Sequence, residues 1–240
     1  MSDFLLIHGA MHGAWCWRDL VPELNLRGHR VQAIDLPGHG GDMTPISKIT
    51  LDLYADAILD AIERDFAGGP VQLVGHSMAG YPISLAAERA PDKIARLIYL
   101  CAYVPAAGQS LADMRKSAPR QPLLPALIRS EDGKSFRVDP AKTEELFYHD
   151  CPEGTAAYAN MRLCAQAVAP QAVPCPLGEN YASVPRSYIR CTDDRTIPPE
   201  FQVTMTHDWP AADVYEMETS HSPFFAAPQE LARLLSQITG

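Results

Sequence analysis

The stretch that most constrains the fold is residues 71–80, which read Val-Gln-Leu-Val-Gly-His-Ser-Met-Ala-Gly. The first four residues favour a buried strand, and residues 81–90 continue with helical spacing. Ser77 therefore falls at the apex of a very tight turn between a strand and a helix. Such a turn strains the serine backbone, needs small neighbours, and holds the hydroxyl at the positive end of the helix. The stretch predicts a nucleophile elbow.

One position departs from the usual Gly-x-Ser-x-Gly pattern of this turn, because Ala79 stands where the last glycine is expected. A methyl group is a small intrusion, and Gly80 follows at once. Most serines that follow a glycine are ordinary turn residues, but the place of Ser77 between a strand and a helix favours a catalytic serine. The rest of the chain must then supply a base, an acid and an oxyanion site.

Strand-like and helix-like segments alternate along the chain. Short runs of apolar and β-favouring residues predict strands at 4–7, 30–34, 71–74, 94–99, 186–190 and 214–217. Helices are predicted at 15–27, from Thr50 onward, and at 81–90 and 229–238. This alternation predicts the α/β class, with a parallel sheet between helices and active loops at the carboxyl ends of the strands.

The alternation of strands and helices is interrupted in one region, 105–184. This region holds many prolines and no convincing strand, whereas 144–149 and 155–167 look like short helices. About 80 residues are too many for a loop in a compact domain, and the region has enough apolar residues to argue against a disordered linker. We therefore expect a helical cap at 105–184 on a core formed by 1–104 and 185–240.

Composition limits the partners of the chain. With 240 residues and 47% hydrophobic content, the chain can bury one substantial core. It carries 20 Lys and Arg against 29 Asp and Glu, a net charge of −9, and no basic cluster. This balance argues against a nucleic acid or an anionic membrane as partner. A small molecule is the expected partner, and a homodimer is left open.

The cysteines and the N-terminus bear on location. The six cysteines are scattered without a Cys-x-x-Cys pair, which favours reduced thiols over a disulfide framework or a zinc site. No basic and apolar leader precedes the first strand, and no apolar run approaches the roughly 20 residues that span a bilayer. We expect a cytoplasmic protein without a metal or cofactor.

Carboxylates and a histidine follow two of the predicted strands. Asp193 and Asp194 come after the strand at 186–190, and His221 lies in the short loop after the last strand. The order serine, aspartate, histidine is typical of a hydrolase triad on a parallel sheet. His221 would take the proton of Ser77, and an aspartate would fix the imidazole tautomer. Their positions alone leave the choice between the two aspartates open.

An oxyanion site needs two N–H donors near the serine. The elbow offers the backbone N–H of Met78, the residue after Ser77. The glycine-containing loop at 8–14 is the expected source of the second donor, and Ala10 is the favoured residue.

Several segments together carry a family resemblance. They are 8–17, 28–36, 73–77, 191–202 and the loop of His221. In these segments the chain resembles the salicylate-esterase-like plant methylesterases and the hydroxynitrile lyases of the α/β-hydrolase superfamily, with their bacterial relatives. The resemblance implies that Asp194, six residues before Glu200, is the triad aspartate, and that Ala10 and Met78 are the oxyanion donors. The predicted cap matches poorly beyond 151–153.

The same resemblance separates two reactions. The cyanide-releasing members carry a threonine in place of Gly9 and a lysine in place of Ser222, so hydrolysis of a small carboxylic ester, methyl esters included, is expected here. A hydroxynitrile lyase stays an alternative. So do other acyl transfers on the same site (thioester, lactone or amide cleavage, or perhydrolysis) and a receptor-like hydrolase fold that binds a ligand.

The remaining expectations concern side chains around the serine. His8, His12 and His76 are expected to support the backbone through packing and hydrogen bonds. An apolar pocket for the acid part of the ester is predicted from Met78, Tyr103, Tyr158, Met161 and Phe224, although core packing explains the residues of the predicted cap equally well.

Overall fold

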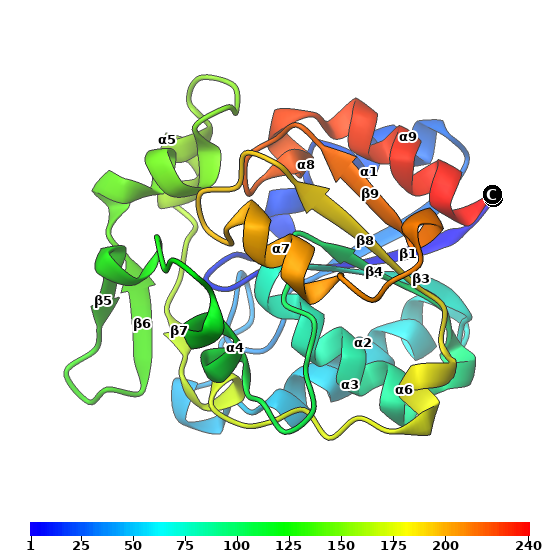
Figure 1. Ribbon diagram of the computed structural model, residues 1–240, viewed down its shortest axis with the longest axis horizontal. Helices are drawn as coiled ribbons and strands as arrows, with labels where there is room; N and C mark the ends of the chain where they lie inside the picture. Colours follow the sequence, from blue (N-terminus) through cyan, green and yellow to red (C-terminus); the bar gives the residue numbers. More distant parts are fainter.

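The computed structural model describes the whole chain, residues 1–240. A six-stranded sheet lies at its centre, in the order β2-β1-β3-β4-β8-β9, and all neighbouring strands are parallel (Figure 1). The strands are β1 (Asp3–Ile7), β2 (Arg30–Ile34), β3 (Val71–His76), β4 (Ile94–Leu100), β8 (Arg186–Cys191) and β9 (Val214–Met217). All six predicted strands and the α/β class are thus confirmed.

Helices cover both faces of this sheet (Figure 1). One face carries α1 (Leu20–Leu26), α8 (Pro223–Ala226) and α9 (Pro228–Thr239), and the other carries α2 (Leu51–Phe66), α3 (Gly80–Arg89) and α6 (Glu179–Ser183). Each face buries its own apolar cluster. The predicted helix at 15–27 is interrupted: Ala14–Trp17 forms a short 3-10 helix and α1 begins only at Leu20. Proline lacks an N–H donor and is tolerated in the first turn of a helix, which is where Pro22 lies.

The segment between β4 and β8 is not wholly helical, so the prediction of a helical cap is corrected. It contains α4 (Leu111–Ser117), a π-helix (Glu144–Tyr148) and α5 (Thr155–Asn160), and it ends with α6. It also contains an antiparallel sheet of β5 (Leu127–Arg129), β6 (Ser135–Val138) and β7 (Gln166–Ala167). The predicted helix at 155–167 therefore ends at Asn160, and its last residues form β7.

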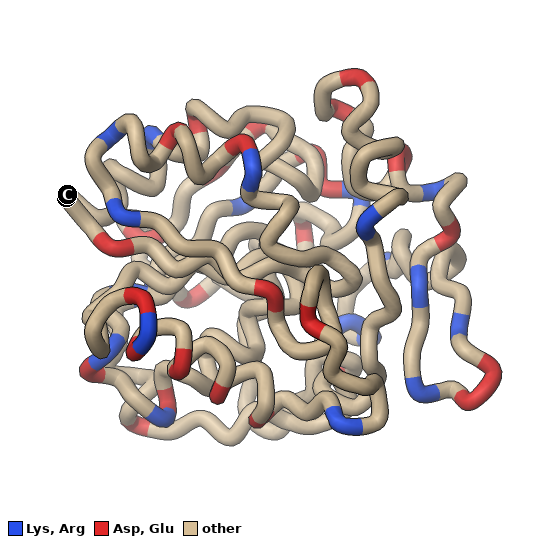
Figure 2. Tube along the Cα trace, turned by 180° about the vertical axis from the view of Figure 1, so that it is seen from behind, with Lys and Arg blue, Asp and Glu red and all other residues tan.

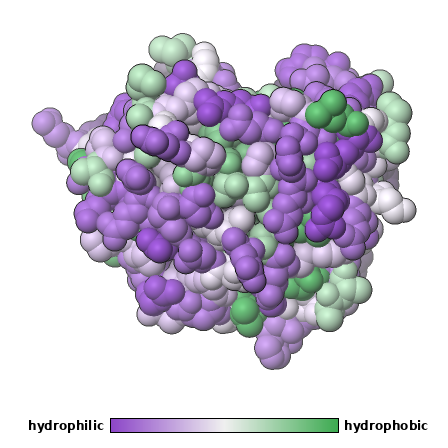
Figure 3. Space-filling model, turned by 90° about the horizontal axis from the view of Figure 1, so that it is seen from above, coloured by the Kyte–Doolittle hydropathy of each residue, from purple (hydrophilic) through white to green (hydrophobic).

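Charged residues of both signs are distributed over the chain. Lys and Arg lie interspersed with Asp and Glu along the trace (Figure 2). The face in Figure 3 is mostly hydrophilic, with small separate apolar spots. No helix combines the length and the apolar character that crossing a bilayer would need.

Candidate active site

Ser77 occupies the predicted turn between β3 and α3. Its φ of 55° lies in the left-handed region, which is strained for any residue with a side chain. Small residues make the turn possible: a Cβ on Gly75 would stand 2.7 Å from the Ile83 side chain, and one on Gly80 would overlap the Tyr103 carbonyl oxygen. Gly80, one position later than the usual pattern, is therefore a glycine that this turn requires, and Ala79 is tolerated.

His221 forms a buried pair with Asp194. The Nδ1–H of His221 donates to Asp194 Oδ2 at 2.8 Å, and both side chains are almost completely inaccessible to solvent. Gln202 Nε2 donates to the same carboxylate oxygen at 3.0 Å. The other oxygen, Oδ1, accepts the backbone N–H groups of Thr196 at 2.7 Å and Ile197 at 2.9 Å. Four donors thus converge on one carboxylate, which fixes its position.

The neighbouring aspartate points elsewhere. The side chain of Asp193 is 61% exposed, and its Oδ2 accepts a hydrogen bond from His149 Nε2 at 2.9 Å. His149 follows the π-helix of the inserted segment, so Asp193 links that segment to the loop after β8. The aspartate that reaches His221 is Asp194.

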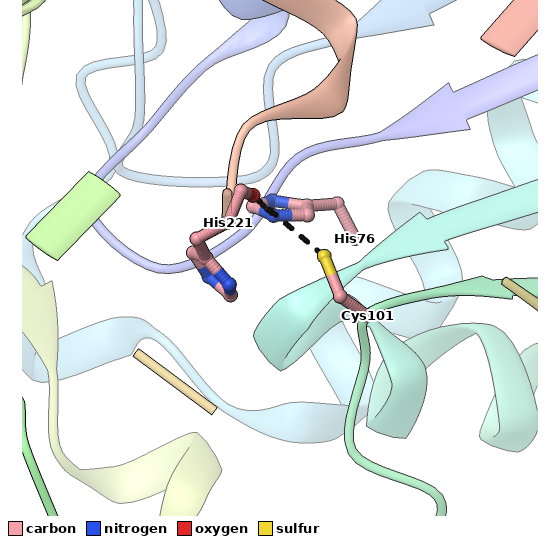
Figure 4. Close-up of side chains that lie close together, drawn as sticks. All are labelled: His76, Cys101 and His221. Atoms are coloured by element: carbon pink, nitrogen blue, oxygen red, sulfur yellow. Dashed lines mark hydrogen bonds between the residues drawn. The ribbon is translucent and has the colours of Figure 1, made fainter. Parts of the chain in front are cut away.

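Two groups hold the backbone of His221 in place (Figure 4). His76 Nε2–H donates to the His221 carbonyl oxygen at 2.8 Å, and Cys101 Sγ–H donates to the same oxygen at 3.6 Å. The rings of His76 and His221 lie 4.6 Å apart between centroids. The bond to Asp194 is the only hydrogen bond of the His221 ring, so Nε2 is free to face the serine that follows His76. His76 therefore has the structural role expected for it.

The ligand atoms of His76, Cys101 and His221 lie within 4.8 Å of one another, the one such group that could hold a metal ion. Two of the three already donate to the backbone of the third. Burial raises the pKa of the Cys101 thiol well above its ordinary value, which keeps the proton that it donates. We therefore assign this cluster to the positioning of His221.

The loop at 8–14 leaves several backbone N–H groups without an acceptor, and that of Ala10 is among them. His8 Nδ1–H donates to the Gly9 carbonyl at 2.8 Å, and His12 Nδ1–H donates to the Ala10 carbonyl at 2.8 Å. These bonds confirm that both histidines support the loop backbone, next to an N–H available for an oxyanion.

The predicted pocket residues do not come together. Tyr103 and Met78 lie at Ser77, since Tyr103 N–H donates to the Ser77 carbonyl at 3.0 Å and Met78 follows the serine in the turn. The other three lie in different surroundings. Phe224 is fully buried against Trp17 and His76, and Met161 is 76% exposed. Tyr158 lies between the guanidinium groups of Arg18 and Arg162, at 3.8 and 3.7 Å from its ring centre.

Three residues at the site were missed by the sequence analysis. Gln202 supports Asp194, the ring of Phe147 lies 5.9 Å from that of His221, and Tyr148 O–H donates to His12 Nε2 at 2.7 Å. Gln202 lies inside a segment that carried the family resemblance, which was the available signal. Phe147 and Tyr148 come from the inserted segment and gave no signal of their contacts.

The buried histidines predict acid sensitivity of the fold. Burial is the largest cause that lowers the pKa of His8, His12, His39 and His76, and it brings the pKa of His12 to about 4. The unfolded chain, with an ordinary histidine pKa of about 6.5, therefore takes up protons first. Stability should fall as the pH drops below about 6.5, and His12 alone should contribute a loss of about 2 kcal/mol at pH 5.

Urea unfolding between pH 8 and 5 measures this loss. Replacing the exposed His207 by glutamine is the control and should leave the pH dependence unchanged. A free energy of unfolding that stays constant down to pH 5 would contradict the assignment of neutral buried histidines.

The fold and this constellation define a serine hydrolase architecture: a strained serine after a central strand, followed by a buried aspartate–histidine pair. A model of the Alpha/beta hydrolase family matches residues 4–234, and the chain belongs to this family.

Relatives match over nearly the whole chain. A pyrethroid hydrolase of Sphingobium wenxiniae is 32% identical over 98% of this chain and 87% of its own length. A putative chloroplastic methylesterase of Arabidopsis thaliana, methylesterase 11, is 33% identical over 99% of this chain, which spans 64% of the length of that plant protein. Among solved structures, polyneuridine aldehyde esterase superposes with a TM-score of 0.88 at 25% identity, covering 100% of both chains.

Proposed function

We propose that this protein hydrolyses small carboxylic esters, with Ser77 as nucleophile, His221 as general base and acid, and Asp194 as the residue that orients His221. The backbone N–H groups of Ala10 and Met78 are the proposed oxyanion donors. The observation that carries the proposal is the buried 2.8 Å bond between His221 Nδ1 and Asp194 Oδ2, beside a serine in the left-handed conformation.

The proposed reaction follows from this geometry. Because Nδ1–H is committed to Asp194, the neutral imidazole carries its lone pair on Nε2 and accepts the Ser77 proton. The Ser77 oxygen bonds to the ester carbonyl carbon, and the carbonyl oxygen becomes an oxyanion held by the two N–H donors. His221 then gives its proton to the leaving alcohol. Water, activated by the same histidine, cleaves the acyl-enzyme and releases the acid.

Methyl esters and other esters of small alcohols are the proposed substrates. Two of the relatives are named methylesterase and pyrethroid hydrolase, and the first name describes cleavage of a methyl ester. The side chain of Ser222, directly after His221, is fully buried and its hydroxyl has no partner. No ammonium group stands there to assist the departure of cyanide, so a hydrolase is favoured over a lyase.

A substrate panel tests this proposal. Methyl and p-nitrophenyl esters, from small aromatic to long aliphatic acids, should turn over many times per enzyme molecule, whereas mandelonitrile and acetone cyanohydrin should decompose at the buffer rate. Repeated turnover also excludes a receptor that binds and cleaves its ligand only once. Cyanide release above background and dependent on Ser77 would favour the lyase instead, and cleavage restricted to thioesters, lactones or amides would favour another acyl transfer.

We also propose that 105–184 acts as a cap on the core formed by 1–104 and 185–240, because side chains of the inserted segment contact His12 and Asp193. A cytoplasmic location is proposed because all six cysteines are unpaired and four of them are buried. The homodimer stays a prediction.

A further inference from the structure

The loop that carries the proposed oxyanion donor Ala10 is tied to the inserted segment at the next residue. Met11 is buried and has a φ of 64°, a left-handed conformation that costs a residue with a side chain about 1–3 kcal/mol. Its N–H donates to Gln166 Oε1 at 3.3 Å, and its carbonyl accepts the N–H of Cys164 at 2.9 Å. Both backbone groups of Met11 are thus held by one short stretch of the inserted segment, whereas the N–H of Ala10 stays free.

The amide of Gln166 is fully engaged. Its side chain is completely buried, and Oε1 also accepts a hydrogen bond from His39 Nε2 at 3.0 Å. Its Nε2 donates to the Tyr54 hydroxyl and to the Ala167 carbonyl, both at 3.2 Å. These partners, on a loop, on α2 and on β7, leave the amide one orientation, with its oxygen toward Met11.

Loss of this oxygen would release the strained residue. Without Gln166 Oε1 the buried N–H of Met11 has no acceptor, which costs about 1–3 kcal/mol. The chain relieves that cost if Met11 leaves the left-handed conformation and the loop at 8–14 changes its path. The N–H of Ala10 lies on the same loop, so it is displaced as well, and a displacement of about 1 Å at a reacting centre can cost about 100-fold in rate.

We infer that Gln166 is a positioning residue of the oxyanion site: through Met11 it holds the N–H of Ala10 where the ester oxyanion develops. This inference rests on the proposed function. It gives the inserted segment a part in catalysis in addition to covering the site.

The test compares Gln166→Leu, which lacks the acceptor, with Gln166→Glu, whose protonated side chain is isosteric with glutamine. With p-nitrophenyl acetate, Gln166→Leu should lower kcat by about 10- to 100-fold and change KM by less than about threefold, because the oxyanion exists only after substrate binding. Gln166→Glu should recover most of kcat. Gln171→Leu is the matched control, since Gln171 is a second buried glutamine of the same segment without a bond to the loop, and should retain wild-type kcat.

A second measurement separates positioning from general damage. Trifluoroacetophenone accepts the Ser77 oxygen at its carbonyl carbon, passes the Ser77 proton to His221, and leaves an oxyanion on the former carbonyl oxygen. Its affinity should fall with kcat in Gln166→Leu, whereas the affinity for acetophenone, which binds without that charge, should stay unchanged. Equal losses for the two ketones, or a folded Gln166→Leu with wild-type kcat, would overturn the inference.

If Gln166→Leu does not fold, Gln166→Met takes its place, and Tyr54→Phe is measured beside it. Tyr54→Phe removes a partner on the donor side of the amide and keeps the bond to Met11, so its kcat should stay within about threefold of wild type. A larger loss in Tyr54→Phe than in Gln166→Met would overturn the inference. Failure of the proposed function looks different: wild type would then show no ester turnover that depends on Ser77.

Discussion

Replacement of Ser77 by alanine is expected to lower kcat for small esters by about 10⁶-fold, the order of loss seen when the nucleophile of a serine protease triad is removed. The change deletes the hydroxyl of the strained turn after β3, which is the group proposed to form the acyl-enzyme. The fold should survive, because alanine is small enough for the turn and removes no hydrogen bond that the structure records for the Ser77 side chain.

Kinetics and covalent labelling check this expectation together. A fluorophosphonate should add one adduct mass to the wild-type protein, on the peptide that contains Ser77, and none to Ser77→Ala. Ser84→Ala is the control, since Ser84 is a buried serine of α3 that bonds to Tyr99 away from His221. Labelling or ester turnover that persists in Ser77→Ala would refute the assignment of the nucleophile.

The elements that could be predicted from sequence are those whose signal is local. The strands β1, β3 and β4 are buried along most of their length and read as short runs of apolar and β-favouring residues, so their positions can be predicted without their partners. The edge strands β2 and β9 are partly exposed and still contain enough β-favouring residues to be recognised. The elbow is equally local, because Gly75, Ser77 and Gly80 impose their turn within six residues. The carboxyl ends of parallel strands lie at one edge of the sheet, which explains why an aspartate and a histidine after separate strands could be paired.

The inserted segment could not be predicted in the same way. Its strands hold two to four residues, too few for an alternating pattern, and β6 pairs with β7 about 30 residues further along the chain. Gly133, between β5 and β6, adopts a positive φ. The position of the Tyr158 side chain was equally hard to predict from sequence. It was predicted to face the substrate, but it packs against Arg18, whose position no local pattern reveals.

The choice between the adjacent aspartates needed the family resemblance, because the chemistry of the two residues is the same. Both follow β8 and both are carboxylates, so spacing alone could not choose. The resemblance pointed to Asp194, and the geometry agrees, because Asp194 is buried against His221 and Asp193 is exposed beside His149. The helix α7 (Pro199–Met205) supplies the physical reason, since it places Gln202 against the Asp194 carboxylate.

These two aspartates give the second large expected effect. Asp194→Asn should lower kcat by about 10⁴-fold, as the equivalent change does in the serine protease triad, whereas Asp193→Asn should cost less than about tenfold. Asparagine has nearly the shape of aspartate, so the pair of variants compares charge and acceptor capacity at two neighbouring positions. The measurement is kcat for p-nitrophenyl acetate, with thermal unfolding to verify that both variants fold.

The hydrogen bonds around Asp194 explain the size of the loss. Its Oδ1 accepts two backbone N–H groups, and its Oδ2 accepts Gln202 Nε2 and His221 Nδ1. An asparagine has one acceptor oxygen, and the two backbone donors, which cannot rotate away, will claim it. The amide NH2 then faces His221, so Nδ1 must become the acceptor and the ring proton moves to Nε2. An imidazole in that tautomer cannot take the proton of Ser77. A larger loss in Asp193→Asn than in Asp194→Asn would contradict this assignment, and equal losses would mean that both carboxylates act on His221.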